Sequence, residues 1–150
     1  MAGHAAAEAI ARRLGVGDWG TVHDDSGFRL TVTRVLRLAA NFVAFWSHET
    51  VEIPIEEGFE ELKLALVADA WSRTYCSRAI ATNDSSAPIT SCRGLVLVPD
   101  GSAKPGRLIL KPETLVAGRA LDETLSDIST RYGGMTADIV ALQLEYPYEK

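Results

Sequence analysis

Cysteine, positive charge and long apolar runs are all scarce in this sequence of 150 residues. Its only cysteines are Cys76 and Cys92, which are too few for a disulfide framework. The 15 Lys and Arg residues are outnumbered by 20 Asp and Glu residues, and the net charge of -5 disfavours nucleic acid, which is bound through phosphate neutralisation. No run approaches the roughly 18 apolar residues of a membrane span, and Met1 to Leu14 lack the apolar core of a secretory signal. We therefore expect a cytoplasmic protein that binds neither membranes nor nucleic acids.

The strong sequence motifs of catalysis are also missing. There is no Gly-x-Gly-x-x-Gly after a strand, no Gly-Lys-Ser/Thr phosphate loop, no His-Glu-x-x-His, no Cys-x-x-Cys and no Gly-x-Ser-x-Gly. These absences argue against dinucleotide redox chemistry, nucleotide hydrolysis, structural zinc and serine hydrolysis. The sequence accordingly predicts no cofactor and no metal site.

The length and composition describe one ordinary globular domain over residues 1–150. The hydrophobic content is 47% and the charged content 23%, close to the average of folded proteins. A chain of this length buries roughly 68–70% of its unfolded surface, so a hydrophobic core can form without metal or disulfide. No linker or internal repeat divides the chain.

The first third of the chain is predicted to hold a helix followed by strands. Residues 1–15 contain an alanine-rich segment that ends at Gly15, as expected of a short helix. Apolar and polar residues alternate at 28–33 and 51–55, and an unbroken apolar run lies within 41–47. With a hairpin partner at 21–23, these patterns predict an antiparallel meander over 18–55, in which Pro54 marks an edge strand or a strand end.

Helical and strand patterns then alternate toward the C-terminus. Apolar residues recur at helical spacing over 59–71 and 121–132, and a last helix is expected after Thr136. Short strands are expected at 74–82, 95–98 and 108–110. The whole pattern predicts the α+β class, with a mixed, partly antiparallel sheet and flanking helices.

Two groups of side chains are candidates for acid-base catalysis. His23 and His48 each stand beside carboxylates, the residue types of an acid-base pair. Glu60 and Glu61 belong to four glutamates between positions 56 and 61, at the start of the helix over 59–71. The histidines and their neighbouring carboxylates are equally explained as solvated residues of turns and strand ends. The glutamates are equally explained by the helix dipole, which favours carboxylates at a helix start, so both interpretations stay open.

Cys92 and three aromatic residues are candidates for ligand binding. Cys92 stands next to Arg93, whose charge favours a reactive thiolate, although a free cysteine is most often a small buried hydrophobic residue. Phe45, Trp46 and Trp71 supply large apolar surfaces that suit a pocket or an interface.

Several short motifs follow one another after position 50. A strand at 51–55 runs into Glu-Gly-Phe-Glu-Glu-Leu at 57–62, the segment 88–100 ends in Pro-Asp, and 108–112 reads Leu-Ile-Leu-Lys-Pro. Residues 120–146 then supply two helices. In this order the motifs resemble the DJ-1/PfpI family, a class I glutamine amidotransferase-like fold. The resemblance implies a DJ-1-like part over 56–150 and, as an alternative fold class, an α/β sandwich.

The sequence departs from that family where catalysis takes place. In the family a nucleophilic cysteine lies on a strand-to-helix elbow after the third strand, near a glutamate of the first helical turn. Here the residues 111–114 lead almost directly into the C-terminal helix, so the elbow segment is missing. The family's glutamate falls near Glu60 or Glu61, and strict register places the catalytic one on Lys63. The resemblance therefore implies a degenerate relative, whose first third completes the sheet that the deletion leaves open.

Three functions are compatible with these residues. The first, which we favour, is a non-catalytic or regulatory domain that binds a small-molecule ligand or dimerises. The second is a small cofactor-independent enzyme that acts on a metabolite through carboxylate and histidine acid-base chemistry. The third is a chaperone-like module that binds a partner segment along a sheet edge. We also expect this acidic protein to form a homo-oligomer, such as a homodimer.

Overall fold

The computed structural model describes residues 3–16, 29–85 and 87–148. A parallel three-stranded sheet lies at its centre, with β1 between β2 and β5, and an antiparallel pair joins β3 to β4. The strands are β1 (Glu49–Pro54), β2 (Ser77–Thr82), β3 (Ile89–Thr90), β4 (Val96–Leu97) and β5 (Leu108–Ile109). α3 (Glu61–Ser72) connects β1 to β2, because adjacent parallel strands need a crossover rather than a hairpin.

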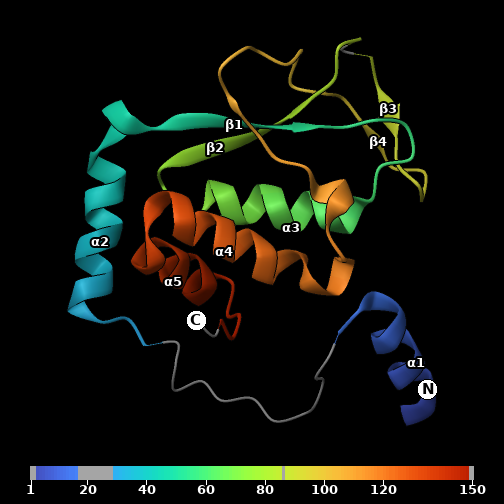
Figure 1. Ribbon diagram of the computed structural model, residues 1–150, viewed down its shortest axis with the longest axis horizontal. Coiled ribbons are helices and arrows are strands. Elements are labelled where there is room, and N and C mark those ends of the chain that lie inside the picture. Colours follow the sequence, from blue (N-terminus) through green and yellow to red (C-terminus); the bar gives the residue numbers. More distant parts are fainter. Residues whose placement is uncertain (1–2, 17–28, 86, 149–150) are drawn as a thin grey trace.

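The helices lie on one side of the sheet (Figure 1). α3, α4 and α5 cover this face, whereas the segment 98–107 passes over the opposite face. α2 stands at the end of the sheet where β1 begins, and α1 contacts the short turn η4. The remaining elements are α1 (His4–Leu14), α2 (Val32–Val43), η2 (Phe45–Ser47), η3 (Pro112–Thr114), η4 (Ala117–Arg119), α4 (Ala120–Tyr132) and α5 (Gly134–Gln143).

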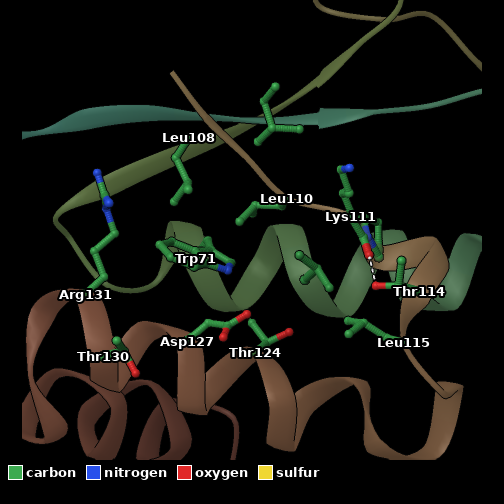
Figure 2. Close-up of a pocket in the computed structure, with 13 residues that line it drawn as sticks. Trp71, Leu108, Leu110, Lys111, Thr114, Leu115, Thr124, Asp127, Thr130 and Arg131 are labelled. Carbon is green, nitrogen blue, oxygen red and sulfur yellow. Dashed lines mark hydrogen bonds between the residues drawn. The ribbon is translucent and has the colours of Figure 1, made fainter. Parts of the chain in front are cut away.

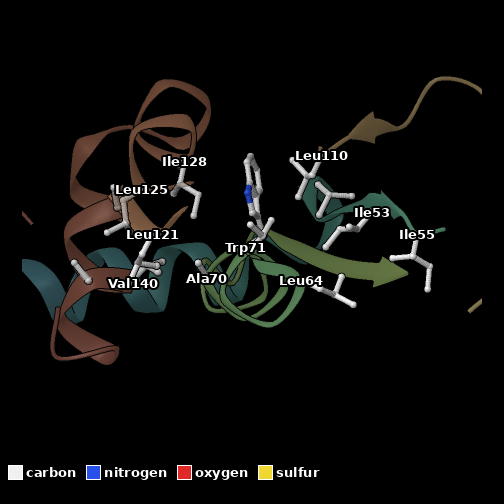
Figure 3. Packing of buried hydrophobic residues seen from close by; sticks show 14 of the residues in the cluster. Ile53, Ile55, Leu64, Ala70, Trp71, Leu110, Leu121, Leu125, Ile128 and Val140 are labelled. Atoms are coloured by element: carbon white, nitrogen blue, oxygen red, sulfur yellow. The ribbon is translucent and has the colours of Figure 1, made fainter. Parts of the chain in front are cut away.

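The hydrophobic core lies between β1 and the helices. Successive side chains of a strand point to opposite faces, so Val51 and Ile53 face the helices and are fully buried. Trp71 of α3 stands between the sheet and α4 (Figure 3). Its ring centroid lies 5.7 Å from that of Tyr132. Leu125 of α4 is likewise fully buried. Each such side chain contributes about 1.5–3 kcal/mol through burial, which holds the two layers together.

The other face of β1 buries a carboxylate. Glu52 is 0% exposed and forms an ion pair with Arg107, whose Nη1 lies 3.0 Å from Oε1. The backbone N–H of Lys104 donates to both carboxylate oxygens at 3.1 Å. The backbone N–H of Leu110 donates to the Glu52 carbonyl at 2.8 Å. Glu52 therefore ties the segment 98–107 and β5 to the central strand.

A second ion pair joins the start of β1 to the end of α4. The guanidinium of Arg131 donates two hydrogen bonds to the carboxylate of Glu49, and the Tyr132 hydroxyl donates a third. Hydrogen bonding from Arg131, followed by that from Tyr132, lowers the pKa of Glu49. Burial, followed by the hydrogen bond to Glu49, raises the pKa of Tyr132 to about 12. The helix layer is thereby fastened to the amino end of the sheet.

The predicted fold class is confirmed. The strands form a mixed set, with parallel pairs around β1 and an antiparallel pair at β3 and β4, and helices flank the sheet. The helices expected at 59–71 and 121–132 are present as α3 and α4. The strand expected at 51–55 is present as β1, but it is the central parallel strand, and Pro54 is its last residue.

The antiparallel meander predicted over 18–55 is wrong in the part that the structure describes. Residues 32–43 form α2 and residues 45–47 form η2, where strands were expected at 28–33 and 41–47. Thr31 caps α2, because its hydroxyl oxygen accepts a hydrogen bond from the backbone N–H of Arg34 at 3.3 Å. The apolar positions 32, 36, 39 and 43 repeat at helical spacing over the whole of α2. The alternation that suggested a strand covers only residues 28–33, so the longer helical pattern prevails. The expected hairpin partner at 21–23 lies outside the described residues.

Replacement of Arg107 by Met should lower the free energy of unfolding by about 3 kcal/mol, because it leaves the fully buried Glu52 carboxylate without its counter-ion. Urea denaturation measures this change. Arg78→Met is the matched control, since Arg78 is an exposed arginine of the neighbouring strand β2, and it should change stability by less than about 0.5 kcal/mol. Equal effects of the two substitutions would contradict a structural role for the Glu52–Arg107 pair.

Glu49→Gln should destabilise the protein in a pH-dependent way. Because the folded-state pKa of Glu49 is lowered, its ion pair stabilises the native state above the unfolded pKa, and this stability is lost as the pH falls through the folded pKa. At pH about 7 the cost should be about 1–2 kcal/mol, and the curves of variant and wild type should approach each other as the pH falls below the unfolded pKa and converge below the lowered folded pKa. Urea denaturation at a series of pH values tests this. Glu8→Gln in α1 serves as the control and should show no such convergence, because the Glu8–Arg12 pair is exposed at 3.9 Å.

Candidate functional site

A crevice of about 370 Å³ lies beyond the carboxyl end of β1. In open parallel sheets ligands bind outside the carboxyl ends of the strands, so this is where the fold places a site. After Pro54 the chain turns at Gly58, whose φ of 83° favours glycine, and enters α3. The crevice is lined by Pro54, Ile55, Glu56, Glu57, Gly58, Phe59, Glu60, Lys63, Leu64, Pro112 and Glu113.

The β3–β4 hairpin fixes the start of α3 beside this crevice. The backbone N–H of Gly58 donates to the Thr90 carbonyl at 2.8 Å, and that of Cys92 donates to the Phe59 carbonyl at 3.0 Å. The carboxylate of Glu57 accepts a hydrogen bond from the Thr90 N–H at 3.1 Å. These contacts hold the glutamates of the segment 56–61 in a defined arrangement before any ligand binds.

Glu61 is engaged by the residues that follow β3. Its carboxylate accepts hydrogen bonds from the Ser91 hydroxyl and from Arg93 Nη1, the latter at 3.1 Å. These two hydrogen bonds, with that from Ser91 the larger, lower the pKa of Glu61. The same hydrogen bond to Glu61 raises the pKa of Arg93. Glu61 therefore stays ionised at neutral pH and is poorly suited to donate a proton.

Glu60 differs from Glu61 in keeping one oxygen without a partner. Its Oε1 lies 2.9 Å from Arg93 Nη1. Its Oε2 is buried and has no hydrogen-bond partner among the described residues. A buried acceptor left unsatisfied costs about 1–3 kcal/mol, and a hydrogen-bond donor of a ligand would recover that cost. Glu60 thus supplies the crevice lining with a buried acceptor that has no partner among the described residues.

The crevice combines apolar walls with mostly negative charge. Phe59, Leu64 and Pro112 supply apolar surface and four glutamates contribute carboxylates, and Lys63 is the single basic residue among the described residues of the lining. The sequence did not single out Pro112 and Glu113 as site residues. They line the crevice because β5 lies beside β1 and leads into η3. Lys63, which the sequence analysis named only as a departure from the DJ-1/PfpI pattern, also lines this cavity.

The structure brings some of the predicted catalytic residues together and separates others. Glu60 and Glu61 lie side by side at the start of α3 and share Arg93. His48 precedes β1, so it lies at the opposite end of this six-residue strand, roughly 20 Å away by strand geometry. Its Nε2 pairs with the Asn41 carbonyl at 2.9 Å. His23 lies outside the described residues. Within the described part, the glutamates therefore have no histidine partner for acid-base chemistry.

The four predicted ligand-binding residues occupy three different places. Cys92 is exposed and lies beside the start of α3, close to Glu60 and Glu61. Phe45 and Trp46 are exposed on η2, with ring centroids 5.3 Å apart. Trp71 is buried in the core. Only Cys92 is therefore adjacent to the crevice.

Trp71 lines a second cavity, of about 440 Å³, beneath β5 (Figure 2). Leu108 and Leu110 approach it from the sheet side, and Asp127 and Arg131 from α4. Burial, followed by the nearby charge of Glu123, raises the pKa of Asp127. Arg131 is already paired with Glu49. This cavity lies under the free edge of β5, where the sheet ends.

Neither cysteine is placed as a nucleophile. Burial raises the pKa of the Cys76 thiol, so at neutral pH it remains protonated. Cys92 lies in the turn between β3 and β4 and not on a strand-to-helix elbow. Between β5 and α4 the chain makes only the two short turns η3 and η4.

The described residues include neither a cluster of metal-ligating side chains nor a membrane-spanning helix. In this part of the chain, His, Cys, Asp and Glu side chains do not gather in groups of three or more that suit a metal ion. The helices there are all too short or too polar to pass through the hydrocarbon layer of a membrane.

Comparison with known proteins gives a likeness of structure only. No protein-family model matches the sequence, and no curated protein matches it significantly. Among solved structures, oxidized DJ-1 of Toxoplasma gondii is similar, with a TM-score of 0.55 and 12% sequence identity, and the match covers 66% of this chain and 99% of that chain. At this identity the likeness shows the fold and no activity. The chain therefore has a DJ-1-like α+β fold.

Proposed function

We propose that this protein is a non-catalytic domain of DJ-1-like fold that binds a small molecule in the crevice at the carboxyl end of β1. The observation that carries the proposal is the buried Oε2 of Glu60, an acceptor without a partner among the described residues, in a residue that lines a cavity of about 370 Å³. The volume is within the range of small-molecule sites. The ligand would pair a hydrogen-bond donor with Glu60 and an apolar group with Phe59 and Leu64.

The charge of the crevice narrows the class of ligand. Glu56, Glu57, Glu60 and Glu113 outnumber Lys63 in its lining. Carboxylates attract cationic donors and repel anions, and a charge-assisted hydrogen bond is about twice as strong as a neutral one. A small amine with an apolar portion fits these features better than a carboxylate or a phosphate.

The absence of an elbow supports a binding role over a DJ-1-like covalent one. β5 leads into η3 and η4 without a cysteine, and Cys92 is exposed in a hairpin turn. Glu61 is held as a carboxylate by Ser91 and Arg93. The degenerate relationship to the DJ-1/PfpI fold and the non-catalytic role are thus parts of the same proposal.

Benzylamine is a suitable probe, because it joins an ammonium group to a small apolar ring. In an NMR titration of the ¹⁵N-labelled protein it should shift the amide signals of Gly58, Phe59 and Lys63, whereas benzoate should not. Glu60→Gln should weaken binding about tenfold, which corresponds to about 1.4 kcal/mol, and should leave the free energy of unfolding nearly unchanged. Glu8→Gln in α1 is the control and should bind like wild type. Unchanged affinity in Glu60→Gln, or shifts confined to the Trp71 cavity, would refute the proposed site.

A further inference from the structure

One side of α2 faces the protein body and carries two of the polar residues of the helix. It packs against α5, and the residues on this side are Arg34, Leu38 and Asn41. Asn41 is buried, and its amide donates to the Thr74 carbonyl at 3.0 Å and to the Thr136 hydroxyl at 3.3 Å. The hydrogen bonds of Asn41 therefore orient α2 on the molecule.

The opposite side of α2 is apolar and exposed. Positions 32, 36, 39 and 43 form one stripe at helical spacing, and Val32 and Leu36 are 77% and 65% exposed. The apolar surface continues into η2, where Phe45 and Trp46 are 71% and 74% exposed and contact each other edge to face. We call this the α2 surface; it comprises Val32, Val35, Leu36, Ala39, Ala40, Phe42, Val43, Phe45 and Trp46.

The α2 surface is large enough to form a stable interface. From the exposed fractions of its larger side chains it presents on the order of 800 Å², when each side chain is given its usual area of about 150–250 Å². The largest apolar patch of an ordinary monomer covers about 300–600 Å², and a standard interface buries about 800 Å² on each partner. Trp and Phe are also the residue types that dominate interface energetics.

The order of residues along the stripe suits a second copy of the same chain. Ala39 and Ala40 lie at its middle, and Leu36 and Val43 lie equally far on either side of them. In an antiparallel pair related by a two-fold axis at the alanines, Leu36 of each copy meets Val43 of the other. The small alanine side chains allow the helix axes to approach to about 8 Å.

A lipid surface is the competing occupant, because exposed apolar and aromatic residues also suit a bilayer interface. Interfacial helices gain much of their affinity from basic residues that attract anionic lipids. α2 carries two arginines and no acidic residue, but Arg34 lies on the side that faces the protein and donates to the Arg29 carbonyl at 2.6 Å, and the net charge of the whole chain is -5. The symmetry of the stripe and the charge therefore favour a protein partner.

We propose that the α2 surface is a homodimer interface, in which two α2 helices pack antiparallel across Ala39 and Ala40 and the Phe45–Trp46 pair extends the contact. The surface lies at the amino end of β1, whereas the ligand crevice lies at its carboxyl end. Dimerisation and ligand binding are thus separable.

Sedimentation equilibrium of the full chain over the micromolar range tests the interface. Wild type should have twice the chain mass of 16.2 kDa. Leu36→Glu should be monomeric, with the dissociation constant raised at least about a hundredfold, because it buries an unpaired charge against Val43 of the other copy. Leu95→Glu is the matched control, since Leu95 is a 54% exposed leucine in the β3–β4 hairpin, and it should remain dimeric. Far-UV circular dichroism and the benzylamine titration should be unchanged in both variants.

A charge-pair experiment tests the antiparallel register. Leu36→Glu and Val43→Lys should each be monomeric alone, and an equimolar mixture should regain the dimer mass, because the two new charges meet across the interface. A monomeric wild type, a dimer that persists in Leu36→Glu, or a mixture that stays monomeric would overturn the proposal. If the wild type is monomeric, its binding to phosphatidylcholine–phosphatidylglycerol vesicles can be measured by co-sedimentation. Binding that is lost in Leu36→Glu would assign the surface to a membrane instead.

Discussion

The buried ion pair between Glu52 and Arg107 is the constraint on which the arrangement of the sheet depends. A carboxylate that is fully buried in a central strand is tolerated only when it is paired and hydrogen-bonded. The partners of Glu52 all come from the segment that leads into β5, so satisfying its charge also places β5 beside β1. Without β5 in that position, Pro112 and Glu113 would not reach the crevice.

The two ends of β1 have different surroundings. At its carboxyl end the start of α3 and the residues after β5 line a small acidic crevice, in which Glu60 has an acceptor oxygen without a partner among the described residues. At its amino end Glu49 is fully paired with Arg131 and Tyr132, and the adjoining α2 and η2 present a broad apolar surface. One strand thereby separates a surface suited to a small ligand from a surface suited to another protein.

The prediction from sequence succeeded and failed for identifiable physical reasons. α3 and α4 were predicted because their apolar residues repeat at helical spacing and pack directly on the core. α2 was mistaken for strands because the alternation at 28–33 and the unbroken apolar run at 41–47 overlap its two ends, and both patterns are typical of strands. At the site, the glutamate cluster at 56–61 was recognised, but the pairing of Glu60 and Glu61 with Arg93 depends on a hairpin about 30 residues away.

The sequence by itself determined the class of fold, the positions of α3, α4 and the parallel strands, and the acidic character of the chain, because these follow from composition and local periodicity. Only the tertiary structure decided that His48 lies at the far end of β1 from Glu60 and Glu61 and that one oxygen of Glu60 has no partner within the described residues. It also decided that the apolar side of α2 points outward. These features arise from contacts between segments distant in the chain, and no local pattern of residues encodes them.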